Sequence, residues 1–131
     1  MSSGASVSPR GRPCILQIGY YASLLSVRAS LLESNGYTVT SVLGNATAMK
    51  LARRVVDSSD LVVIGSSSEY AVRMTMLSWL KQYYPEVPVV VLQSHSSEKF
   101  PAAEGVTLSE DPEVWLAAVA AYLNPRYNGS S

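Results

Sequence analysis

Short runs of apolar residues alternate along this chain with longer stretches in which apolar residues are spaced as on a helix. The short runs are residues 15–18, 61–64 and 87–92. Runs of this length and uniformity are typical of parallel strands covered on both faces. Residues 37–42 alternate and are rich in β-branched side chains, which predicts a strand nearer a sheet edge. Residues 105–108 predict a short fifth strand.

Apolar residues at helical spacing predict four helices, over residues 22–35, 45–56, 68–84 and 112–123. In the first, the apolar face is read from Leu24, Val27, Leu31 and Leu32. Gly36 suits the end of that helix, and Asn45, Ser68 and Asp111 are candidate N-caps for the other three. The stretch after the fourth strand is polar and contains Pro101, which predicts a shortened or missing fourth helix.

Strands and helices in this order predict an α/β fold, a flavodoxin-like doubly wound (βα)5 three-layer sandwich with the parallel sheet order 2-1-3-4-5. A length of 131 residues suits one domain. We expect that domain to span residues 14–124. The Ser/Gly/Pro-rich residues 1–13 and the residues 125–131 are expected to be disordered tails.

The charge balance and the cysteine count exclude several classes of function. Ten basic and ten acidic residues cancel, so the chain lacks the positive footprint of a nucleic-acid-binding protein. A single cysteine, Cys14, excludes an internal disulfide, and a single histidine, His95, excludes the usual zinc site. The longest apolar runs are too short to span a membrane. We expect a cytoplasmic protein with no cofactor and no bound metal.

One set of segments, taken together with their order and spacing, resembles a known family. The segments are residues 15–18, 23–25, 31–39, 60–64, 84–92 and 111–113. They resemble the response regulator receiver (CheY-like) domains of two-component signal transduction and phosphorelays. It covers nearly all of the expected domain. It implies the fold predicted above and a role in signalling.

The five residues that carry out receiver chemistry are missing from this chain. By the resemblance, the acidic pair that binds Mg²⁺ is replaced by Gly19 and Tyr20, and the phosphate-accepting aspartate is replaced by Gly65. Gln93 stands for the Thr or Ser after the fourth strand, and Leu108 or Ser109 for the lysine after the fifth. The resemblance therefore implies a degenerate phosphorylation pocket. An aspartate restored at Gly65 alone would be a lone buried charge, expected to destabilise the fold.

Two clusters of serines follow the third and fourth strands. Ser66, Ser67 and Ser68 with Ser94 would lie at the carboxyl edge of the sheet, where open α/β sheets bind ligands, and could form an anion or ligand crevice. The alternative is that they only cap helices and form turns. His95 is close to these serines, but the chain has no G-x-S-x-G motif, so we expect no enzyme and no catalytic residue.

The function predicted from these features is a phosphorylation-independent pseudo-receiver, a regulatory module that acts through protein–protein interaction. Its partner would be a protein of a signalling pathway or a second copy of the chain, with no nucleic acid and no membrane. Trp79, Tyr83 and Tyr84 are candidate contact residues on the third helix. The alternative function is a small-ligand or anion sensor that uses the serine-rich crevice.

Overall fold

Five parallel strands form one sheet in the order β2-β1-β3-β4-β5, as the sequence predicts. The computed structural model describes residues 11–128. The strands are β1 (Cys14–Gly19), β2 (Thr38–Leu43), β3 (Leu61–Ile64), β4 (Val89–Gln93) and β5 (Gly105–Leu108). The order reverses direction at β1 and β3, and the ligand sites of doubly wound sheets lie at such a reversal.

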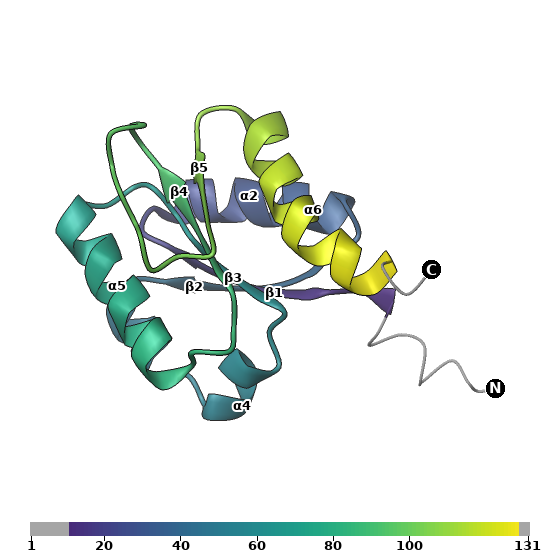
Figure 1. Cartoon of the computed structure of the whole chain (residues 1–131), viewed down its shortest axis with the longest axis horizontal. Helices are drawn as coiled ribbons and strands as arrows, with labels where there is room; N and C mark the ends of the chain where they lie inside the picture. The colour runs from purple at the N-terminus through teal and green to yellow at the C-terminus, as the bar shows by residue number, and fades with distance from the viewer. Residues whose placement is uncertain (1–10, 129–131) are drawn as a thin grey trace.

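Helices cover both faces of the sheet and make it the middle of three layers (Figure 1). One face carries α2 (Ala22–Ser34) and α6 (Pro112–Asn128). The other face carries α3 (Asn45–Met49), α4 (Arg53–Asp57) and α5 (Tyr70–Tyr83). This arrangement confirms the predicted flavodoxin-like sandwich.

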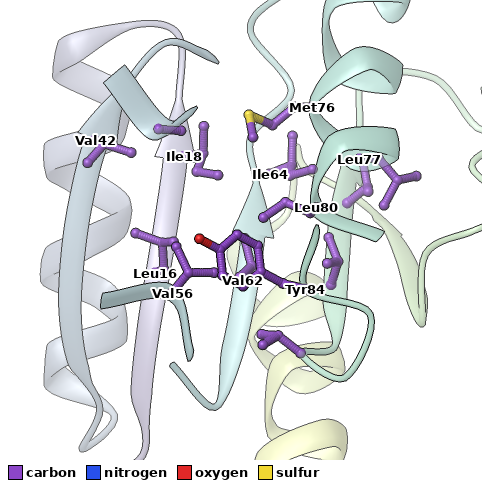
Figure 2. Packing of buried hydrophobic residues seen from close by; sticks show 14 of the residues in the cluster. Leu16, Ile18, Val42, Val56, Val62, Ile64, Met76, Leu77, Leu80 and Tyr84 are labelled. Atoms are coloured by element: carbon purple, nitrogen blue, oxygen red, sulfur yellow. The ribbon is translucent and has the colours of Figure 1, made fainter. Parts of the chain in front are cut away.

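The two cores follow from the two-residue period of the strands. Every residue of β3 is buried. Val62 and Ile64 pack toward α5, whereas Leu61 and Val63 pack toward α2 and α6. Figure 2 shows the first of these cores, in which Leu80 of α5 lies beside the two β3 residues. A strand that is apolar at every position is therefore needed here, because both of its faces are covered.

The structure corrects three details of the predicted helices. The stretch predicted as one helix over residues 45–56 is two short helices, α3 and α4. Asn45 is not an N-cap, because Gly44 holds that position with a φ of 88° and the Asn45 side chain bonds elsewhere. Ser68 is not an N-cap either, because α5 begins at Tyr70 and its N-cap residue is Glu69. The predicted cap at Asp111 is confirmed by a 3.0 Å hydrogen bond from the Glu113 N–H.

The chain passes from β4 to β5 without a helix, so the fourth helix is lost rather than shortened. Phe100, which is buried, fills part of the face that a helix would cover and packs with the α5 side of the core. The Tyr122 hydroxyl of α6 donates a hydrogen bond to the carbonyl of Glu104, at the end of this connection. The loop between β4 and β5 is therefore held by single side chains rather than by helical packing.

The last helix ends at Asn128 rather than at the expected Leu123, so residues 125–128 are helical and not part of a tail. The remaining residues of the two predicted tails, 1–10 and 129–131, lie outside the described residues. Within the described part of the chain, every helix is too short or too polar to cross a lipid bilayer.

Candidate functional site: the carboxyl edge of the sheet

The five positions that the resemblance assigns to the receiver residues lie at one edge of the sheet. Gly19 ends β1, and Gly65 directly follows β3, the strand paired with β1. Gln93 and Leu108 are paired at the ends of β4 and β5. Because the strands are parallel, these positions share the carboxyl edge, and Tyr20 follows Gly19 there.

A buried arginine, which the sequence did not single out, lies where the resemblance places the acceptor aspartate. Arg28 of α2 is only 8% exposed. A β-carbon built on Gly65 would lie 3.2 Å from Arg28 Nη1, and Arg28 Nη2 donates to Ser66 Oγ at 3.2 Å. No ion pair joins Arg28 to an acidic group within residues 11–128. Burial without such a partner lowers the pKa of the Arg28 guanidinium.

The side chain of Tyr20 lies on the other face of the sheet from Arg28 and packs against the α5 side of the core. Its hydroxyl donates to Asn45 Oδ1 at 2.8 Å, and Asn45 Nδ2 donates to the Val72 carbonyl at 3.0 Å. Burial raises the pKa of Tyr20 to about 12, with the nearby positive charge of Arg73 opposing that rise. Tyr20 therefore links β1 to α3 and α5, at a position where the resemblance places a carboxylate.

A second buried arginine ties the β4–β5 loop to α5. Arg73 is 1% exposed and forms a bidentate pair with Glu98, with Nη2–Oε2 at 2.6 Å and Nη1–Oε1 at 3.0 Å. Its Nε also donates to the Ser68 carbonyl at 3.0 Å. The hydrogen bonds from Arg73 hold the pKa of Glu98 at about 2, although partial burial of the carboxylate opposes this shift.

The two serine clusters have different hydrogen-bond partners, so the two sides of the predicted crevice differ in charge. Ser94 donates its N–H and its hydroxyl to the Glu98 carboxylate, at 2.9 and 3.0 Å. Gln93 Nε2 donates to the Glu98 carbonyl at 2.8 Å. The β4 side of the edge is thus committed to the loop and carries a paired negative charge. On the β3 side, Ser66 accepts a hydrogen bond from Arg28, and the Ser68 carbonyl accepts one from Arg73.

The described residues offer no ready place for a metal ion. Among residues 11–128, no group of three or more His, Cys, Asp or Glu side chains is placed to hold one. Mg²⁺ prefers carboxylate oxygens, and the position beside Gly65 carries a guanidinium instead.

Comparison with known proteins supports the fold. No family model matches the chain, and no curated protein matches it. A response regulator receiver domain protein from Clostridium thermocellum superposes with a TM-score of 0.74 at 18% identity, covering 87% of this chain and 96% of that one. The response regulator TrrA from Thermotoga maritima, solved in complex with Mg²⁺-BeF, gives 0.72 at 15% identity, covering 85% and 99%. The chain has the receiver fold. At these identities the likeness establishes fold alone.

A chemotaxis response regulator of Vibrio cholerae, CheY4, is similar to the same extent. It gives a TM-score of 0.68 at 19% identity, covering 86% of this chain and 99% of that one. The chain spans almost the full length of all three proteins, although it has no helix between β4 and β5. The roles of Gly19, Tyr20, Gly65, Gln93 and Leu108 as a degenerate pocket stay a prediction.

A sequence signal for the two buried arginines does exist. Arg28 lies three and four residues from Leu25 and Leu32, the buried residues of α2, so it shares their face. Arg73 lies three and four residues before Met76 and Leu77, which are buried on α5. A charged residue at core spacing in an otherwise apolar stripe is therefore the pattern that marks both positions.

Proposed function

We propose that this chain is a pseudo-receiver, a regulatory module that acts through protein contact and does not switch by phosphoryl transfer. The observation that carries the proposal is the Arg28 guanidinium beside Gly65, where a phosphorylated aspartate and Mg²⁺ would need to be. A buried cation next to this position disfavours a second cation by charge repulsion. Cytoplasmic localisation and the absence of enzymatic activity belong to the same proposal.

We expect no Mg²⁺-dependent response of the protein to beryllofluoride. The chain has no carboxylate at Gly19, Tyr20 or Gly65 to bind the metal or the fluoride complex. Amide NMR spectra before and after addition, and mass spectrometry after incubation with acetyl phosphate and Mg²⁺, provide the measurement. TrrA of T. maritima is the positive control. A Mg²⁺-dependent adduct near Gly65 would contradict the proposal.

The surface that supports protein contact is the outer side of α2. Tyr21, Leu24 and Val27 are 60%, 38% and 55% exposed and follow one another at three-residue spacing. Between Tyr20 and Leu32 the only charged residue is Arg28, which is buried, so this surface carries no charge. Exposed apolar side chains without charges are typical of contact surfaces. Of the residues expected from the sequence, Tyr84 is buried, whereas Tyr83 is exposed and its ring lies tilted against that of Trp79.

We expect a Val27→Glu variant to lose the protein partner that the wild-type chain retains. Docking of a partner on this surface would bury the new glutamate without a counter-charge, which opposes binding. Light scattering of the purified chain tests for a second copy, and co-purification tests for another protein. Tyr83→Glu, on the opposite face of the sheet, is the matched control. Equal retention by both variants, or loss with Tyr83→Glu alone, would refute the assignment to α2.

The sensor alternative keeps one specific observation in its favour. Arg28 and Ser66 place a buried positive charge and a hydroxyl on the β3 side of the serine-rich crevice. Ser94, on the β4 side, is already bound to Glu98. If a ligand binds at this edge, it therefore binds beside Ser66 rather than between the two clusters.

A further inference from the structure

We propose that a small oxyanion of the phosphate type binds at the carboxyl ends of β1 and β3, held by Arg28, by Ser66 and by the backbone N–H groups of residues 66–68. This proposal deepens the sensor alternative. It does not depend on the protein-contact function, because it concerns a different surface from the outer side of α2.

The first argument is the unbalanced charge of Arg28. Its side chain is more than nine-tenths buried, and its one hydrogen bond within residues 11–128 goes to a neutral hydroxyl, Ser66 Oγ. A guanidinium carries five N–H donors and is matched to anionic oxygens. Glu33, the nearest acid along the chain, and Glu69, which follows the serine loop, are both exposed and form no ion pair in the described structure. A buried charge in this state is stabilised by an external anion.

The second argument is that two helices direct their N-termini to the same edge. α2 begins three residues after β1 ends, and α5 follows β3, which is the neighbouring strand. Neither helix has a side-chain cap or an acidic residue in its first turn. Each N-terminus carries about half a positive charge, so both add to the field of Arg28. The acid at these N-termini is Glu69, the N-cap residue of α5, which is exposed and whose side chain forms no capping hydrogen bond.

The third argument is the set of free donors in the β3–α5 loop. Within residues 11–128, the N–H groups of Ser66, Ser67 and Ser68 donate to no protein acceptor, whereas the Gly65 N–H is used by the Ile18 carbonyl. Ser66 and Ser68 are half-buried and Ser67 is exposed, so a ligand reaches them from solvent. A tetrahedral oxyanion offers acceptors to a guanidinium and to several loop N–H groups at once.

The test is a titration of the ¹⁵N-labelled full chain with inorganic phosphate at constant ionic strength. We expect saturable amide shifts at residues 66–68 and in the first turn of α2. Arg28→Met should weaken binding by about tenfold or more, because a charge-assisted hydrogen bond is lost. Arg54→Met is the matched control, since Arg54 lies with Cys14 and Thr38 at the opposite edge of the sheet. It should leave binding unchanged.

Two further variants keep the proposal testable if Arg28→Met does not fold. Gly65→Asp keeps the guanidinium but supplies a carboxylate beside it, so phosphate binding should be lost. Gly65→Asn has the same shape without the charge and should bind more tightly than Gly65→Asp. The absence of saturable shifts at tens of millimolar phosphate, or equal affinity in all variants, would overturn the proposal.

The oxyanion can be free phosphate or the phosphate group of a larger metabolite, and a second arm distinguishes these. Adenosine 5′-monophosphate and adenosine are titrated in parallel with inorganic phosphate. Tighter binding of the nucleotide, with the same Arg28 dependence, assigns the site to a phosphorylated metabolite. Equal affinity for the nucleotide and phosphate assigns it to the free ion. Binding of adenosine alone would contradict an oxyanion site. Binding of phosphate beside Arg28 needs no Mg²⁺ and forms no covalent bond, so it leaves unchanged the expected absence of a Mg²⁺-dependent adduct.

Discussion

We expect the Glu98→Gln variant to unfold with a free energy about 3–5 kcal/mol lower than the wild-type protein, because it leaves Arg73 buried without its counter-charge. Arg73 is 1% exposed, so water cannot replace the lost carboxylate. Its bonds to the Ser68 and Leu92 carbonyls remain but do not neutralise the charge. Typical domains have only about 5–15 kcal/mol of stability, so the loss is large.

Urea unfolding followed by tryptophan fluorescence measures this loss. The control is Asp57→Asn, which breaks the exposed Arg53–Asp57 pair at 3.6 Å and should cost about 0–1 kcal/mol. A loss for Glu98→Gln no larger than that of the control would show that the Arg73–Glu98 pair contributes nothing beyond a surface ion pair.

The pH dependence of stability gives the same variant an independent readout. The pKa of Glu98 is about 2 in the folded chain, against an ordinary value of 4.5. A group whose pKa is depressed on folding stabilises the protein fully above its unfolded pKa. That contribution is lost as the pH falls from 4.5 toward 2, so wild-type stability should fall over this range more steeply than that of Glu98→Gln. Parallel curves would contradict the assigned role of Glu98.

The sequence predicted the sheet well because strand formation here is local. The bounds of β3 and β5 match the prediction. The ends of β3 are visible in the sequence because the strand is a short apolar run, and the start of β5 is visible because the strand begins at a glycine. Gly36, predicted as a helix terminator, has a φ of 94°, a conformation that favours glycine. The sheet order followed from the alternation of strands and helices, which restricts the topologies available.

The buried side of α2 was predicted less well. Leu24 and Val27 were expected on the core side but are exposed, and the buried residues are Leu25, Arg28 and Leu32. The helix is apolar nearly all round, so its periodicity does not distinguish its two sides. The predicted face therefore lies one position away from the observed one for Leu24 and Val27, and it does not include Arg28, the residue that lies beside Gly65.

The β4–β5 loop could not be predicted from local pattern either. Its polar composition correctly indicated that a full helix is absent. What holds it is an ion pair between Arg73 and Glu98, which are 25 residues apart in the sequence, together with Phe100. Contacts of this kind depend on tertiary structure, so no short sequence window contains them.

We expect Gly65→Asp to be tolerated in the wild-type chain, contrary to the expectation from sequence that a lone buried charge would destabilise it. The β-carbon of residue 65 would lie 3.2 Å from Arg28 Nη1, so the new carboxylate meets a buried cation that lacks a counter-charge. The contact is tight, but the atom in question is the end of a flexible side chain, which can shift by a few tenths of an ångström. The ion pair offsets the burial of the aspartate.

In the Arg28→Met background the same aspartate should cost about 3–5 kcal/mol, because its charge is then buried without a partner. Gly65→Asn in both backgrounds is the control, since it adds the same volume without the charge. The difference between Asp and Asn across the two backgrounds isolates the interaction of residue 65 with Arg28 in a double-mutant cycle. A coupling close to zero would show that Arg28 does not act on this position in solution. The restored aspartate still lacks the two acidic neighbours that Mg²⁺ requires, so even the tolerated variant should not be phosphorylated.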